Sequence, residues 1–182
     1  MKRLFLIAGM MSALALAIVA SSLAAANFAG TWNLDKAKSQ GLSTRMQGAD
    51  KVTWTITQDD KTISIDQKVE GGQPPAGGGG GGTGGGGGGM GGGRPPAGPT
   101  AYNLDGSETS SENGPAKSTM KATWSGATLE LSRKTVFQGP NGEVTSNTTQ
   151  KLSLSADGKV LTAVVHSESP RGAQDSTLVF NK

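Results

Sequence analysis

The sequence predicts an all-β protein whose strands form an antiparallel up-and-down barrel of about eight strands. Short segments alternate apolar and polar residues with the period of two that is typical of half-buried strands. Turn signals such as Asp157-Gly158 separate these segments, and the only candidate for a helical turn is the segment 35–49. Short connections make consecutive strands antiparallel neighbours, and barrel closure would remove exposed edges, although a two-sheet sandwich fits the same pattern.

The segment 1–26 precedes this pattern and has the composition of a secretory signal peptide. Lys2 and Arg3 are followed by an apolar run over 4–20 and by small residues up to Ala26, which offer a cleavage site. The apolar run of about 17 residues is near the lower limit for a membrane span, and no charged stop follows it. We therefore expect cleavage after Ala26 and a secreted or periplasmic mature chain without a membrane span.

Composition limits the possible partners of the mature chain. The sequence has 17 basic and 14 acidic residues, and removal of Lys2 and Arg3 with the signal leaves 15 against 14, a net charge of +1. No basic cluster with interleaved aromatic residues indicates a nucleic-acid interface. The sequence has no cysteine, which excludes disulfides and a lipid anchor on cysteine, so the predicted single domain over 27–182 depends on its apolar core.

The strands before residue 70 have the clearest alternation. The first is expected over 28–34. Over 52–57, Val, Trp and Ile alternate with three threonines, which is typical of a half-buried strand. Asp59-Asp60 predicts a turn, after which two isoleucines continue the alternation in a strand that ends near Val69.

A glycine- and proline-rich tract at 70–99 interrupts the strand pattern. Residues 77–93 are glycine except for Thr83 and Met90. A phosphate-binding loop would need a helix after the glycines, whereas Arg94-Pro95-Pro96 follows, and proline has no backbone N–H to donate. Glycine has no side chain to bury and loses the most backbone freedom on ordering, so we expect a long disordered loop within one domain.

The second half of the chain repeats the alternation between short turns. Ser125-Gly126, Pro140-Asn141-Gly142 and Asp157-Gly158 are turn signals. They separate expected strands over 101–104, 118–124, 128–137, 143–154, 160–167 and 176–181.

Arg133 is the one residue that breaks the pattern of its strand. It has the parity of Leu129 and Leu131, so a regular strand points its side chain toward the core. An inward arginine is costly unless it is paired, and it can hold an anionic ligand. A bulge that shifts the register, or a hairpin that projects beyond the barrel, would instead place Arg133 in water.

The residues Asn27-Phe28-Ala29-Gly30-Thr31-Trp32 match the first-strand pattern of lipocalins, and they also resemble the start of intracellular fatty-acid-binding proteins. Both belong to the calycin barrels, so the resemblance implies that Gly30 lets the strand bend and that Trp32 packs across the closed end. Exported bacterial lipocalin-like proteins are the most similar set, through Leu104-Asp105-Gly106-Ser107-Glu108 and Leu154-Ser155-Ala156-Asp157-Gly158-Lys159. That resemblance implies a fold and no activity.

Three departures from these families bear on function. Fatty-acid-binding proteins hold a lipid carboxylate with an arginine and a tyrosine on the last strand, where this chain has Leu178 and Phe180. Their two-helix lid is missing or reduced to Asp35–Ala49. Lipocalins stack an arginine from late in the chain on the tryptophan. The sole candidate for this role here is Arg171, which lies in a predicted turn.

Two functional hypotheses remain, and neither is enzymatic. The sequence has one histidine, His166, and a histidine metal site needs more ligands than this. It contains no nucleophile elbow and no cofactor motif. In one hypothesis, the chain is a structural or interaction module of the cell envelope with a filled barrel. Alternatively, the barrel binds a small hydrophobic or anionic molecule, for which the candidate lining is Trp54, Tyr102, Met120, Trp124 and Arg133.

Overall fold

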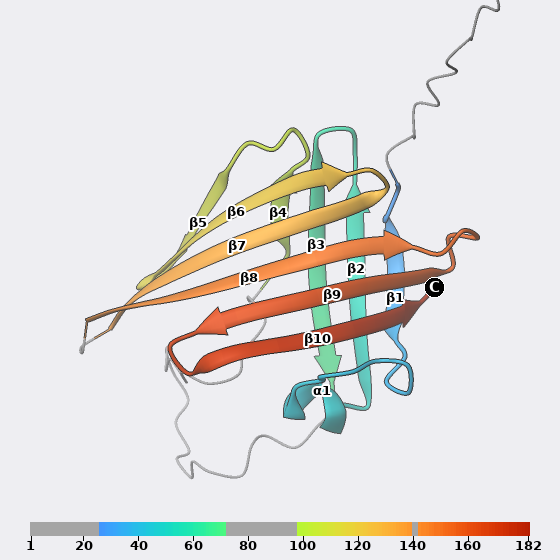
Figure 1. The fold of residues 1–182 in the computed structure, drawn as a ribbon, viewed down its shortest axis with the longest axis horizontal. Coiled ribbons are helices and arrows are strands. Elements are labelled where there is room, and N and C mark those ends of the chain that lie inside the picture. Colours follow the sequence, from blue (N-terminus) through green and yellow to red (C-terminus); the bar gives the residue numbers. More distant parts are fainter. Residues whose placement is uncertain (1–25, 72–97, 140–141) are drawn as a thin grey trace, which may run out of the picture.

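The computed structural model describes residues 26–71, 98–139 and 142–182 (Figure 1). Over these residues the chain forms ten strands and one short helix. Their bounds are β1 Gly30–Leu34, α1 Thr44–Gly48, β2 Lys51–Gln58, β3 Thr62–Glu70, β4 Thr100–Asn103, β5 Thr109–Asn113, β6 Ala116–Ser125, β7 Thr128–Gly139, β8 Gly142–Leu154, β9 Val160–Ser169 and β10 Gly172–Asn181.

All ten strands belong to one antiparallel sheet in the order β4-β3-β2-β1-β10-β9-β8-β7-β6-β5. The sheet rolls into a nearly closed barrel, because β1 pairs with β10 and the two end strands, β4 and β5, come close together. In Figure 1, β1–β4 cross behind β6–β10 at a steep angle. The all-β antiparallel barrel is thus confirmed, and two separate sheets are not what the structure shows.

The predicted number of about eight strands is wrong. The pattern missed β5, whose sequence Thr-Ser-Ser-Glu-Asn contains no apolar residue and gives no alternation to detect. This strand forms because it pairs with β6, from Thr109 opposite Met120 to Asn113 opposite Ala116. The expected helical turn within 35–49 is present as α1.

Two sequence predictions fall largely outside the described residues. The predicted signal peptide, 1–26, is described only at Ala26, and the predicted glycine-rich loop, 70–99, only at its ends. The first residue of that loop, Glu70, belongs to β3.

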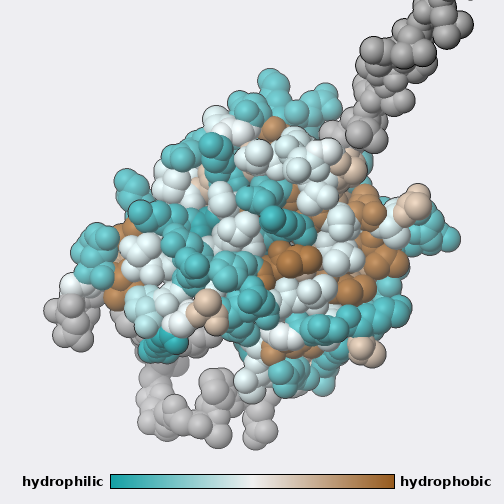
Figure 2. Space-filling view, in the orientation of Figure 1, coloured by the Kyte–Doolittle hydropathy of each residue, from teal (hydrophilic) through white to brown (hydrophobic). Residues whose placement is uncertain are grey.

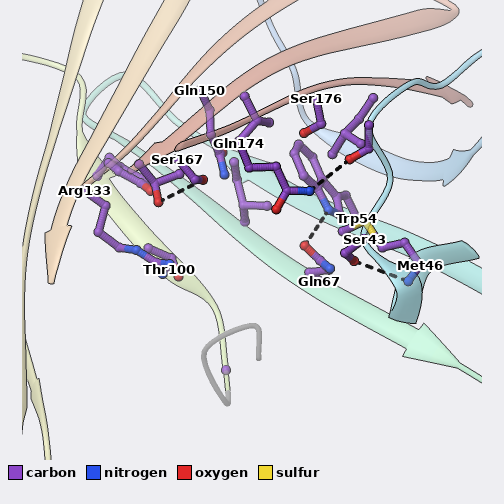
Figure 3. A pocket seen from close by; sticks show the side chains of 17 residues that line it. Ser43, Met46, Trp54, Gln67, Thr100, Arg133, Gln150, Ser167, Gln174 and Ser176 are labelled. Atoms are coloured by element: carbon purple, nitrogen blue, oxygen red, sulfur yellow. Dashed lines mark hydrogen bonds between the residues drawn. The ribbon is translucent and has the colours of Figure 1, made fainter. Parts of the chain in front are cut away.

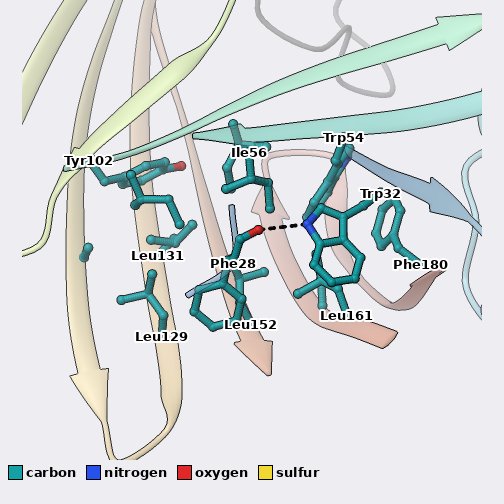
Figure 4. Packing of buried hydrophobic residues seen from close by; sticks show 14 of the residues in the cluster. Phe28, Trp32, Trp54, Ile56, Tyr102, Leu129, Leu131, Leu152, Leu161 and Phe180 are labelled. Atoms are coloured by element: carbon teal, nitrogen blue, oxygen red, sulfur yellow. Dashed lines mark hydrogen bonds between the residues drawn. The ribbon is translucent and has the colours of Figure 1, made fainter. Parts of the chain in front are cut away.

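The two ends of the barrel differ in what fills them. We call the end with the β2–β3, β6–β7 and β8–β9 turns the core end, and the opposite end, with α1 and the β9–β10 turn, the cavity end. Close-packed apolar side chains fill the core end (Figure 4). Burying each such side chain contributes about 1.5–3 kcal/mol. The largest fully buried residues are Phe28, Trp32, Trp54, Phe180, Ile63, Leu129, Leu131, Leu152 and Leu161.

Gly30 and Trp32 both have the surroundings of structural residues. Trp32 is fully buried, and its Nε1 donates a hydrogen bond of 2.8 Å to the carbonyl of Phe28. Gly30 has a φ of +143°, which L side chains rarely adopt. The cation over the Trp32 ring is Lys182, whose Nζ lies 5.1 Å from the ring centre, whereas Arg171 lies in the β9–β10 turn.

The outer face of the larger wall of the barrel is mostly polar. Figure 2 shows hydrophilic and intermediate residues over most of the face formed by β5–β10, with a few small apolar spots. In the described part of the chain, Val164 is the one large hydrophobic residue with a well-exposed side chain. This face therefore presents no broad apolar patch of the kind that marks a docking surface.

Candidate ligand-binding cavity

A cavity of about 220 Å³ occupies the cavity end of the barrel (Figure 3). Residues of β2, β3, β4, β7, β8, β9 and β10 form its wall, and Met46 of α1 and the preceding residues Gly41 and Ser43 cover part of it. The cavity thus lies inside the barrel, above the packed core.

The cavity exists because inward-facing positions change from apolar to polar along each long strand. On β8 the inward residues run from Leu152 to Gln150 and then Thr148, and on β10 Leu178 is followed by Ser176. Side chains alternate faces along a strand, so these residues share the inner face in unbroken register. The half of the barrel with polar side chains at these positions contains the cavity, while apolar side chains fill the other half.

Among the described residues that line the cavity, Arg133 is the one with a charged side chain. It lies on β7, where it pairs with Thr148, and the pairing of β7 with β8 is regular from Leu129 to Gly139. The bulge that would have turned Arg133 outward is therefore absent from these strands. In the described part of the chain, no carboxylate lies within 4.0 Å of the Arg133 guanidinium.

Tyr102 brings a phenol to the same cavity from β4, on the facing wall. Its burial raises the pKa of the hydroxyl above the ordinary value, and the positive charge of Arg133 offsets part of this rise by lowering it. The hydroxyl therefore stays protonated at neutral pH and can donate a hydrogen bond to an anion that is held by Arg133.

Trp54 joins the floor of the cavity to the core beneath it. Its ring packs against Phe180, with a centroid distance of 4.4 Å, and is nearly fully buried. Its Nε1 donates a hydrogen bond of 3.1 Å to Oε1 of Gln67, which faces it across β2 and β3. Because this bond uses the Gln67 amide oxygen, the amide nitrogen makes no hydrogen bond to another described residue of this cavity wall.

The segment between β1 and β2 forms a cover over the cavity end. Gln40 exchanges two backbone hydrogen bonds with Thr177 of β10, of 2.8 and 3.0 Å. Gly41 approaches β10 so closely that a Cβ at this position would lie 2.3 Å from the carbonyl oxygen of Asp175. Lys36 donates to the carbonyl of Gln47 at 3.2 Å, and thereby satisfies a free carbonyl near the end of α1.

The structure brings together three of the five predicted lining residues, Trp54, Tyr102 and Arg133. Met120 is buried in the core, and it borders a second hollow, over β6–β8, that Arg133 also borders. Trp124 lies toward the core end, stacked on Phe28 with ring centroids 6.0 Å apart. Neither Met120 nor Trp124 lines the cavity.

Sequence reasoning missed several polar residues that line the cavity. Gln67 continues the inward parity of Ile65, and Gln174 shares the parity of Ser176 and Leu178. Gln150 was not missed, because its parity with Leu152 places it, with Thr148, in a polar patch expected opposite Arg133. The sequence feature that could have identified Gln67 and Gln174 is the same one that identified Arg133, namely a polar residue at an inward-facing position of a strand. Glutamine carries no charge, however, so it contrasts less with its neighbours.

His166 lies outside the barrel, between two carboxylates. Its Nδ1 is 2.6 Å from Oδ1 of Asp175 on β10, and its Nε2 is 3.2 Å from Oε1 of Glu168. Hydrogen bonds to Asp175 and then Glu168 raise the pKa of the imidazole above its usual value. Both ring nitrogens are engaged, so this arrangement gives no support to a serine–histidine hydrolase.

Neither a metal-binding cluster nor a membrane-spanning helix is found among the described residues. Over 26–71, 98–139 and 142–182, no group of three or more His, Cys, Asp or Glu side chains is placed to hold a metal ion. Among the same residues, the structure shows no helix of the length and apolar character needed to cross a membrane.

Comparisons with known proteins give a likeness of overall fold alone. No protein-family model matches the chain, and no curated protein does. A similar solved structure is the zebrafish ileal bile acid-binding protein complexed with cholic acid, with 14% identity, a TM-score of 0.46, and coverage of 85% of this chain and 98% of that chain. The resemblance to exported bacterial lipocalin-like proteins stays a prediction.

Proposed function

We propose that this chain is an exported binding protein whose barrel takes a small anionic molecule with a partly apolar body. The observation that carries the proposal is Arg133, a cation that faces the cavity without a carboxylate partner among the described residues. A partly buried charge without a partner is costly to the fold. A bound anion would supply the missing partner.

The other lining residues suit such a ligand. Tyr102 offers a protonated hydroxyl in the same cavity as the Arg133 guanidinium, and Trp54 and Leu178 give an apolar floor. The volume of about 220 Å³ is below the roughly 300–1,000 Å³ of drug-sized ligand sites. The ligand is therefore small, such as a short or single-ring carboxylate, rather than a long-chain lipid.

Fluorescence titration can test the proposal directly. Trp54 lines the cavity, so occupancy should change the intrinsic tryptophan emission. The ligand panel would contain small alkyl, cyclic and hydroxylated carboxylates, each beside its neutral primary amide. We expect carboxylates to bind and their amides to bind at least about tenfold more weakly, since hydrogen bonds to charged groups contribute about 1.5–3 kcal/mol.

Two variants of adjacent residues make a matched pair for this titration. Arg133→Gln removes the inward charge and should lose at least about tenfold in carboxylate affinity. Lys134→Gln removes a charge from the next, outward-facing residue of β7 and should leave affinity unchanged. Equal loss in both variants would point to general electrostatic attraction instead of a site in the cavity.

The alternative function, an envelope module with a filled barrel, draws support from the core end. Phe28, Trp32 and Phe180 are fully buried there and leave that half packed. Failure of every carboxylate in the panel to bind, together with no small molecule retained in native mass spectrometry of protein from its source, would favour this module over a binding protein.

Export is a separate part of the proposal and has its own test. Its support is the order of basic start, apolar run and small residues within 1–26. N-terminal sequencing of protein recovered from the periplasm or medium of an expressing bacterium should begin at Asn27. Recovery of the chain in the cytoplasm with Met1 or Lys2 at its start would overturn export without bearing on the cavity.

A further inference from the structure

The cavity contains more hydrogen-bond donors than the described residues use. The guanidinium of Arg133 has five N–H donors. Gln67 accepts from Trp54 through Oε1, which leaves its amide nitrogen without a hydrogen bond to another described residue. The Gln150 side chain makes no hydrogen bond to a described residue and points into the cavity (Figure 3).

These donors are in reach of water. Among the residues that the structure describes, no side-chain nitrogen or oxygen is both fully buried and without a hydrogen-bond partner. A ligand that enters the cavity must therefore displace water from Gln67 and Gln150. A ligand that cannot replace those hydrogen bonds loses affinity.

The register of the strands places Gln150 beside the proposed anion position. Arg133 pairs with Thr148, and Gln150 lies two residues further along β8, on the same inner face. Such diagonal neighbours are about 7–8 Å apart. A cyclic ligand whose carboxylate binds Arg133 would thus bring the substituents on the far side of its ring to Gln150. Gln67 lies on β3, in another part of the cavity wall.

Resting on the proposed function, we propose that the cavity selects small carboxylates that carry hydroxyl groups over unsubstituted carboxylates of the same carbon skeleton. Gln67 and Gln150 are the specificity-determining residues, because their amides donate to the ligand's hydroxyl oxygens. The ligand class is therefore a hydroxylated cyclic acid and not an alkyl acid.

Isothermal titration calorimetry with two matched ligands tests this inference. The ligands are cyclohexanecarboxylate and 1,3,4,5-tetrahydroxycyclohexanecarboxylate, which share one carbon skeleton. Two new hydrogen bonds predict that the hydroxylated acid binds the unsubstituted chain at least about tenfold more tightly. Gln150→Leu and Gln67→Leu should each reduce this ratio, and Gln150→Asn, which keeps the amide, should retain part of it.

The control variant is Gln138→Leu, which removes an exposed amide near the end of β7 that donates to Glu143, outside the cavity lining. It should leave the ratio unchanged, and circular dichroism establishes that each variant is folded. Equal or tighter binding of cyclohexanecarboxylate by the unsubstituted chain would overturn the inference and leave the proposed function intact. A preference that persists in both glutamine-to-leucine variants would overturn the role given to these residues, while failure of all carboxylates to bind would overturn the proposed function itself.

Discussion

The Nζ of Lys182 lies 5.1 Å from the centre of the Trp32 ring, above a tryptophan that the core encloses on its other sides. Gly30 leaves room for this contact, since a Cβ on Gly30 would lie 2.9 Å from Cε of Lys182. The first strand and the last residue of the chain therefore meet at one point. A cation in this position contributes about 0.5–1 kcal/mol when exposed and more when desolvated.

Gly30→Ala should lower the free energy of unfolding by about 1–3 kcal/mol, because alanine strains a φ of +143° and its Cβ crowds Lys182. Urea unfolding measures the loss. Lys182→Ala separates the two causes: in that background the cost of Gly30→Ala should fall, since the crowding is removed and the φ is unchanged. An equal cost in both backgrounds would contradict any role for Lys182.

Gly41→Ala should detach the cover of the cavity from β10. Its φ is +65°, and the new Cβ would lie 2.3 Å from the backbone oxygen of Asp175, which cannot move away as a side chain can. We expect a loss of about 1–3 kcal/mol in urea unfolding and faster amide exchange at Gln40 and Thr177.

Gly48→Ala, in the same connection, is the control. Nothing lies within 4 Å of a Cβ at this position, the last residue of α1, so the change should be neutral or stabilising by up to about 1 kcal/mol. Similar losses in both variants would show that the segment is merely intolerant of substitution.

Arg133→Met should leave the free energy of unfolding unchanged or raise it by up to about 2 kcal/mol, while it abolishes the charge in the cavity. The reason is that no carboxylate among the described residues pairs with Arg133, so removal of the guanidinium breaks no ion pair there. Chemical unfolding in the absence of ligand measures this change. A clear destabilisation would mean that Arg133 serves the fold.

His166 should titrate above the usual pKa of a histidine because Asp175 and Glu168 hydrogen-bond to its ring. Since the folded-state pKa is raised, the contribution of this group to stability is complete below 6.5, the ordinary value, and is lost as pH rises through the folded-state pKa. The chain has one histidine, so one imidazole resonance in an NMR titration reports it without ambiguity.

Two substitutions measure how much each carboxylate contributes to the raised pKa of His166. Asp175→Asn should lower the His166 pKa more than Glu168→Gln, because the bond to Asp175 is the larger cause. The opposite order would assign the main interaction to Glu168.

The alternation of residues predicted which face of a strand each side chain occupies, but not its depth along the barrel. Trp54, Trp124 and Arg133 were all expected to face inward. Trp54 and Arg133 line the cavity, whereas Trp124 stacks on Phe28 toward the other end. Depth depends on strand register and on the stagger of the whole barrel, which no single segment of sequence contains.

Contacts between distant segments were the other feature that the sequence did not reveal. The strand β5 has no apolar residue and owes its existence to its partner, β6. Lys182 follows the last strand without any pattern of its own, and its position over Trp32 depends on the pairing of β1 with β10. Residues whose environment is created by another segment leave no local signal.

The separation of the packed end from the cavity end has a consequence for how such a chain can change over generations. Most of the enclosed apolar side chains lie below the cavity, so replacements among residues such as Gln150 and Ser176 leave the source of stability largely untouched. New ligand preferences can then arise by single substitutions without a prior gain in stability. A barrel built in this way is a scaffold on which recognition evolves faster than architecture.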